Sequence, residues 1–164
     1  MKRSLTTAVC ILALTIAVLS LAVSMSTSIA TAQATGDLKM PTAKIVPPAA
    51  DIPDDIRAFS GKWKGRWRSW ACPPAHGLDA ILFVVEVTQT TASCRYSWGN
   101  DVGWNIPPGL VRPKARFERK DGRVYLTWET KDGVPFHFWI EGEKMKGKKG
   151  PLTNNQYEVE MQRF

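Results

Sequence analysis

Residues 59–70 alternate between apolar or glycine positions and cations, and this pattern constrains the fold more than any other feature of the chain. Lysine and arginine occupy the even positions from 62 to 68, and the odd positions carry Phe59, Gly61, Trp63, Gly65 and Trp67. Successive side chains of a strand point to opposite faces, so the pattern predicts a strand with two buried tryptophans and an exposed row of cations. The two glycines leave room for indole rings and let the strand coil, as the first strand of a small closed barrel requires.

The first 34 residues have the organisation of a secretory signal. Lys2 and Arg3 give a basic start, residues 9–23 are almost wholly apolar, and Ala32-Gln33-Ala34 is a small-residue cleavage motif. We expect cleavage after this motif. The alternative is an uncleaved anchor, because residues 4–35 carry no charge and are long enough to span a bilayer. The basic start stays in the cytoplasm in either case, so we expect the rest of the chain to be periplasmic or secreted.

Cleavage would leave 130 residues, the size of one domain. Without Lys2 and Arg3, 20 basic side chains stand against 15 acidic ones, a net charge of +5. No nucleic-acid-binding motif accompanies this moderate excess, so we expect no nucleic-acid partner, and membrane contact only if the signal is retained. Four prolines among small and polar residues make residues 35–53 an expected extended linker, which leaves residues 54–164 as the folded domain.

The cysteine count falls from three to two on export, because Cys10 lies in the signal. Cys72 and Cys94 are then an even pair in an oxidising compartment, which predicts a structural disulfide. Their spacing is not the Cys-x-x-Cys of redox pairs.

Turn signals set the number of strands. Asp121-Gly122 and Asp132-Gly133 fit tight hairpin turns, and residues 53–59 predict one helical turn before the first strand. The expected strands are residues 59–70, 78–90, 92–98, 113–120, 123–130, 134–141, 143–149 and 156–164. Eight short antiparallel strands without a long amphipathic helix predict an all-β, eight-stranded up-and-down barrel, with an open sandwich as the alternative.

Closure of such a barrel would place the last strand beside the first. Glu158 and Glu160 would then face the cations at positions 62–68 and those at 144, 146 and 148. Opposite charges across strands contribute roughly 0.2–1 kcal/mol each, so the cation row has a structural explanation. The alternative is an exposed basic face that meets an anionic surface such as lipopolysaccharide or an acidic protein.

The motif Gly61-Lys62-Trp63, at the start of an expected eight-stranded barrel, resembles the opening Gly-x-Trp of the lipocalin and avidin group. The resemblance covers residues 59–164. It implies structural roles for Gly61 and Trp63, and for an arginine of the closing strand that packs over the tryptophan, here Arg163. Residues 65–67 and 96–109 are similar to small bacterial lipocalin-like domains, which imply no particular activity.

A second resemblance is to secreted inhibitors of bacterial metalloproteases, which are also small exported barrels. It rests on the Pro-rich segment, Gly61-x-Trp63, the pair Cys72 and Cys94, and Gly103-Trp104. It implies a protein-binding module whose free N-terminal segment enters the cleft of an exported protease.

The chain is rich in tryptophan, with seven at positions 63, 67, 70, 98, 104, 128 and 139. Such rings either fill the interior of a small domain or line a cavity for one small apolar or planar ligand. Trp104 lies in residues 99–112, the longest expected break between strands, which we expect to fold over one mouth of the barrel. The candidate ligand-binding residues are Trp67, Tyr96, Trp98, Trp104 and Trp128.

Catalysis has little support in the sequence. The two histidines, His76 and His137, are far apart and belong to no catalytic or zinc-binding motif, and the facing of Glu86 within an apolar run is not fixed by the pattern. We therefore expect no enzymatic activity, no metal and no cofactor. The expected function is an exported lipocalin-like barrel that binds a small apolar or aromatic molecule in or at its mouth. The alternative, a protein-binding module, predicts a filled interior and a projecting N-terminal segment.

Overall fold

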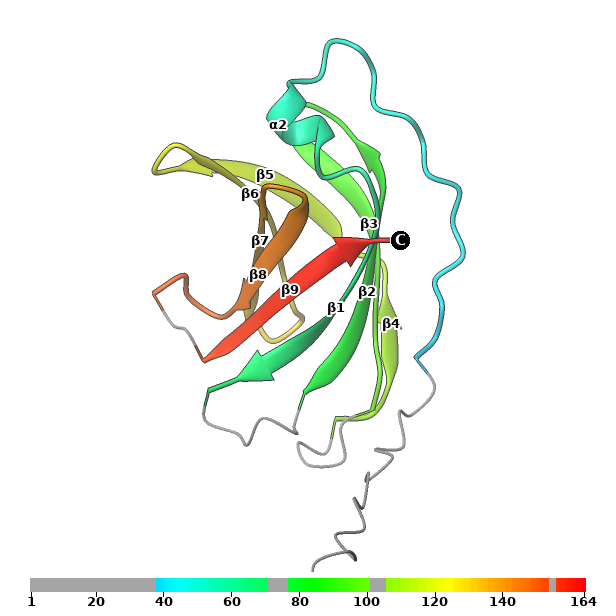
Figure 1. The fold of residues 1–164 in the computed structure, drawn as a ribbon, viewed down its shortest axis with the longest axis vertical. Helices are drawn as coiled ribbons and strands as arrows, with labels where there is room; N and C mark the ends of the chain where they lie inside the picture. The colour runs from blue at the N-terminus through cyan, green and yellow to red at the C-terminus, as the bar shows by residue number, and fades with distance from the viewer. Residues whose placement is uncertain (1–37, 71–76, 101–105, 154–155) are drawn as a thin grey trace, which may run out of the picture. The chain divides into compact units, whose positions relative to one another are not determined.

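Strands dominate the computed structural model, which describes residues 38–70, 77–100, 106–153 and 156–164 (Figure 1). The expected signal and its cleavage site lie outside these residues. The elements are α2 (Asp54–Arg57), β1 (Gly61–Ser69), β2 (Leu78–Val87), β3 (Thr91–Trp98), β4 (Gly109–Val111), β5 (Lys114–Lys120), β6 (Arg123–Glu129), β7 (Pro135–Glu141), β8 (Lys144–Lys149) and β9 (Tyr157–Arg163).

Eight of these strands close into an antiparallel barrel. The strand order is β2-β1-β9-β8-β7-β6-β5-β3, and β2 also pairs with β3, so neither end of the series is left as an edge. Each strand except the short β4 therefore has at least two neighbours, which confirms the eight-stranded up-and-down barrel and excludes the open sandwich. The added strand β4 pairs with the end of β3 alone.

Turn chemistry explains where the strands end. Asp121 and Gly122 both have positive φ, 51° and 73°, and form the two-residue hairpin between β5 and β6 as predicted. Asp132-Gly133 is part of a wider loop, because the last pair of β6 and β7 joins Glu129 to Pro135. The strand predicted to reach residue 90 ends at Val87, because the Thr88 hydroxyl accepts a hydrogen bond from the Thr91 amide at 2.9 Å and turns the chain.

The predicted break at residues 99–112 is interrupted by a strand. Gly109–Val111 forms β4 against the end of β3, with Gly109 opposite Trp98. Trp104 lies outside the described residues, so its expected place over the mouth stays a prediction.

One end of the barrel is densely packed. The residues before and within α2 place Ile52 and Ile56 in the core, and Phe59 lies against Phe117 with ring centroids 5.3 Å apart. Trp63 is 1% exposed, and its indole N–H donates to the Phe59 carbonyl at 2.9 Å. The end of the barrel at which β1 begins is therefore filled.

Arg163 fastens this end. It lies opposite Trp63 in the β1–β9 register, with its guanidinium 4.1 Å from the centre of the Trp63 ring. Its Nη1 and Nη2 donate to the carbonyls of Ser60 and Ala58 at 2.6 and 2.5 Å. A Cβ on Gly61, whose φ is +127°, would lie 2.5 Å from Nη1, so glycine is required there. The packing implied by the lipocalin resemblance is thus present.

The described part of the expected linker packs against the barrel. The Val46 amide donates to the Val85 carbonyl at 2.8 Å, and the Ser97 hydroxyl donates to the Lys39 carbonyl at 2.7 Å. These bonds hold the segment against the outward face of β2 and β3 (Figure 1), where Ile81 and Phe83 are each 3% exposed. Apolar outward residues of β2 explain why a polar-looking segment docks here.

Cys94 is a free, buried thiol, which contradicts the predicted Cys72–Cys94 disulfide. Cys94 lies opposite Val84, which lies opposite Gly61 at the start of β1. Ser69 is about 26 Å further along β1, and the three residues to Cys72, outside the described residues, reach back at most about 11 Å. A disulfide needs Cα atoms within about 7 Å. Burial raises the pKa of the Cys94 thiol to about 12, so it stays protonated.

The outward cation row is interleaved with acids, as closure of the barrel predicts. Glu160 lies opposite Arg66 and accepts a hydrogen bond from the Lys144 ammonium at 2.5 Å. Glu158 lies opposite Arg68, with a carboxylate oxygen 3.6 Å from the Lys148 ammonium. The row is therefore part of a cross-strand charge ladder over β1, β9 and β8.

Trp63→Ala should lower the free energy of unfolding by ~3–5 kcal/mol, because it empties the packed end and removes the ring beneath Arg163. Denaturant unfolding measures the loss. Trp70→Ala is the matched control: Trp70 is 77% exposed, and its truncation should cost less than ~0.5 kcal/mol. A loss below about 1 kcal/mol for Trp63→Ala would contradict this register.

The free energy of unfolding of the protein should be the same with and without a phosphine reductant, because the fold keeps Cys94 unbridged. A disulfide closing a loop of this length would contribute ~3 kcal/mol. A reductant-dependent loss of that size, abolished in Cys72→Ser, would restore the disulfide.

Candidate functional site

A cavity of about 900 Å³ occupies the end of the barrel opposite α2. Its lining includes residues near the ends of β1, β3, β6 and β8 and near the starts of β2, β7 and β9, which antiparallel order brings to the same end of the barrel. The cavity lies above the packed core, so the barrel is filled at one end and hollow at the other.

Four of the five candidate ligand-binding residues line this cavity: Trp67, Tyr96, Trp98 and Trp128. Each lies in the inward phase of its strand. The fifth, Trp104, is outside the described residues. The sequence selected these side chains of β1, β3 and β6 because they are aromatic, and the structure shows that they lie together in one cavity.

The lining residues that were not identified from the sequence include Phe136, Tyr157 and Lys149. The Phe136 ring stacks on Trp128 with centroids 5.3 Å apart and an interplanar angle of 13°. Phe136 lies two residues before the buried Phe138, so alternation along β7 predicts that its side chain points inward. The pattern does not show where along the barrel axis the interior becomes hollow.

A hydrogen-bonded pair joins the aromatic lining to the core. The Trp67 indole N–H donates to the Tyr96 hydroxyl at 2.6 Å, and both residues are buried. Burial raises the pKa of Tyr96, so the phenol remains neutral. Trp67 also packs edge-on against Phe136 and Phe138, with centroids 5.5 and 5.9 Å away. These contacts hold the inner wall rigidly.

Trp98 is fixed from the side of β4. Its indole N–H donates to the Pro107 carbonyl at 2.9 Å. A Cβ on Gly109 would clash with Cζ2 of the same ring, so only glycine lets the β4 backbone approach so closely. The short added strand therefore sets the position of an aromatic lining residue.

Charged side chains stand at the mouth. The cations are Arg112, Lys131 and Lys149, and the acids are Glu129 and Asp132. Lys149 belongs to the inward phase of β8, and its ammonium lies 5.9 Å from the centre of the Phe136 ring and 5.7 Å from that of Tyr157.

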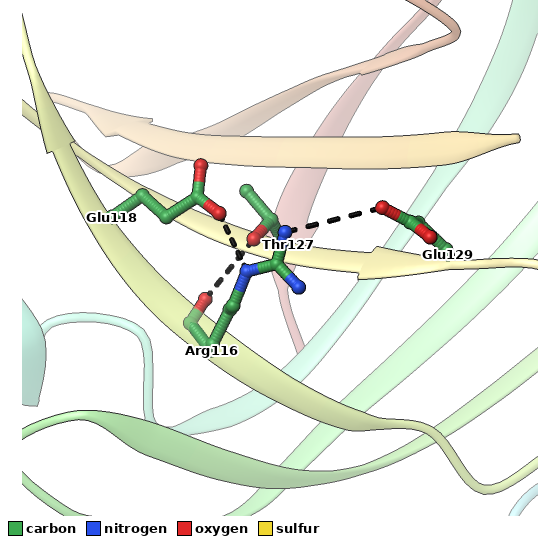
Figure 2. Close-up of polar contacts among 4 residues, drawn as sticks. All are labelled: Arg116, Glu118, Thr127 and Glu129. Atoms are coloured by element: carbon green, nitrogen blue, oxygen red, sulfur yellow. Dashed lines mark hydrogen bonds and ion pairs between the residues drawn. The ribbon is translucent and has the colours of Figure 1, made fainter. Parts of the chain in front are cut away.

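Glu129 belongs to a polar cluster on the outer face of the barrel, with Arg116, Glu118 and Thr127 (Figure 2). The Arg116 Nε donates to Glu118 at 2.6 Å, and its Nη2 lies 3.9 Å from a Glu129 oxygen. This hydrogen bond lowers the pKa of Glu118, and Thr127 donates to the Arg116 carbonyl at 3.5 Å. The Glu129 carboxylate at the rim of the cavity is therefore oriented toward Arg116 on the outer face.

The remaining candidate groups lie apart from the cavity. His137 is half-buried on the outward face of β7, where desolvation lowers its pKa, and Glu86 is exposed. His76 lies outside the described residues. Within the described ranges, no three His, Cys, Asp or Glu side chains gather as metal ligands, and no helix is long and apolar enough to cross a membrane.

No protein-family model matches this chain, and comparisons with curated proteins and with solved structures give no match. The fold and the cavity define its class: a closed eight-stranded antiparallel β-barrel with an aromatic mouth, compatible with a lipocalin-like fold.

Tyr96→Phe should lower the free energy of unfolding by ~1–3 kcal/mol, because it leaves the buried Trp67 N–H without its acceptor. Tyr125→Phe is the control, since the half-buried Tyr125 hydroxyl has no hydrogen bond in the described structure. In a double-mutant cycle with Trp67→Phe, the losses should fall short of additivity by about 1 kcal/mol. Strict additivity would contradict the pairing.

Proposed function

We propose that the protein is an exported, non-catalytic, lipocalin-like barrel that binds one small apolar or aromatic molecule at its mouth. The observation that carries the proposal is the cavity of about 900 Å³ above a filled core. Small-molecule sites are typically concave, mostly apolar and roughly 300–1,000 Å³ in volume. The volume of this cavity lies within that range and aromatic side chains form much of its lining, which supports the proposal.

The lining favours a ligand with an apolar or planar body. Six aromatic side chains contribute to the wall: Trp67, Tyr96, Trp98, Trp128, Phe136 and Tyr157. Rings of this kind offer large apolar faces with little flexibility, and they bind planar or hydrocarbon groups by stacking and by removing apolar surface from water. A ligand can reach them from the mouth without opening the packed end.

The alternative of a protease-inhibiting module has less support. That plan needs a filled interior and a free N-terminal segment, whereas this barrel is hollow at one end and the segment before α2 bonds to β3 at Lys39 and to β2 at Val46. The proposal assigns no chemical step to the protein. Its ligand would be a molecule present in the periplasm or outside the cell, to which the signal sequence directs the chain.

The neutral fluorophore N-phenyl-1-naphthylamine tests the proposal. It should bind with one-to-one saturation and take up excitation energy from the lining tryptophans. Trp98→Ala should weaken binding by about tenfold, the equivalent of about 1.4 kcal/mol of lost contact. Trp139→Phe, on the outward face of β7, should leave binding unchanged. Absence of saturable binding, or equal weakening by both variants, would contradict a site at the mouth.

A further inference from the structure

We propose that the ligand is an amphipathic anion, with an apolar or aromatic body inside the mouth and one carboxylate-type group that pairs with Lys149. This inference rests on the proposed function, since it specifies the chemistry of the molecule that occupies the same cavity. It assigns Lys149 as the residue that selects the charge of the ligand.

The strand places Lys149 in the cavity. In β8 the inward phase carries Met145 and Gly147, both buried in the barrel, and the next inward position is Lys149. Its partner across the ladder is Phe136, one of the aromatic rings of the wall. The three other lysines of β8 are in the outward phase, so Lys149 is the lysine that this strand directs to the mouth.

The Lys149 ammonium has aromatic neighbours and no counter-ion. Two ring faces, those of Phe136 and Tyr157, lie 5.9 and 5.7 Å away, and no carboxylate of the described residues forms an ion pair with it. Cation–π contact compensates only part of the hydration that an ammonium loses beside apolar walls. A ligand anion would supply the missing charge-assisted hydrogen bond.

The other charges at the mouth favour the same sign of ligand. Arg112 and Lys131 add two cations to the lining. Of the two acids, Glu129 lies 3.9 Å from Arg116 on the outside of the wall, and Asp132 balances the neighbouring Lys131 in the loop between β6 and β7, which leaves the charges of Arg112 and Lys149. The surroundings of a bound head group would therefore be positive, which attracts anions and repels cations.

The outward lysines of β8 show why Lys149 is distinctive. Lys144 and Lys148 contact Glu160 and Glu158, and Lys146 pairs with Glu141. These cations are neutralised within the charge ladder. Lys149 is the one lysine of β8 whose charge is left for a partner that the described residues do not contain.

Three probes of equal chain length test the inference: decanoate, decanol and decylamine, each measured by displacement of N-phenyl-1-naphthylamine from the exported protein. Decanoate should bind more tightly than decanol, and decylamine more weakly. Lys149→Met keeps the length of the side chain and removes the charge. It should weaken decanoate binding by about tenfold while leaving decanol binding unchanged or slightly tighter. The preference for decanoate in the unmodified protein should shrink in high salt.

Lys120→Met is the matched control, because it removes the same charge from an exposed position of β5. It should leave all three affinities unchanged. If the fluorophore and decanol bind but decanoate has no advantage, or keeps its advantage in Lys149→Met, the anion inference is wrong and the proposed function stands. If the fluorophore and all three probes fail to bind, both are wrong.

Discussion

The register that sets Trp63 of β1 opposite Arg163 of β9 is the constraint on which the rest of the barrel depends. A slip of one residue would turn both tryptophans of β1 to solvent and its cations into the core, because side chains alternate along a strand. Arg163 prevents this slip by three contacts at once, over the Trp63 ring and with the carbonyls of Ala58 and Ser60. The helical turn before β1 is thereby tied to the last strand, and the first end of the barrel is closed.

Closing one end so firmly allows the other to stay hollow. Aromatic surface at the mouth costs free energy in water, and an unfilled interior gives up packing contacts. The buried Trp63 and Phe59 at the filled end offset that cost. The hydrogen bond between Trp67 and Tyr96 joins two side chains of the cavity lining. It fixes their positions, so the lining can keep its shape without a ligand.

Local patterns predicted much of this fold. The alternation of residues 59–70 gave β1 and its facing, Asp121-Gly122 gave the hairpin between β5 and β6, and the acids of β9 pair with cations on both sides. These features depend on neighbours in sequence or in the ladder. The alternation also selected Trp67 as an inward residue.

The sequence could not predict features that depend on the position of a residue along the barrel axis or on contacts between segments distant in the chain. An even number of cysteines does not show where each one lies along the barrel axis. Cys94 is near the filled end, whereas β1 ends at Ser69 near the other end, before Cys72, which is outside the described residues. β4 forms because Gly109 lets its backbone approach the Trp98 ring, a contact that the sequence does not reveal. The proline-rich composition of residues 35–53 likewise does not show which strands this segment contacts. Lys149 shares the inward phase of β8 with Met145 and Gly147, but only the closed structure shows that the barrel is hollow around Lys149.

Fluorine NMR of the protein labelled with 5-fluorotryptophan tests the central claim most directly, since each indole reports its own surroundings. With the barrel filled at one end and hollow at the other, saturation with N-phenyl-1-naphthylamine should shift the resonances of Trp67, Trp98 and Trp128. The resonances of Trp63 in the packed end and Trp139 on the outer face should stay in place. Shifts at Trp63 or Trp139 that equal those at the mouth, or no shift at the three lining tryptophans, would contradict the account.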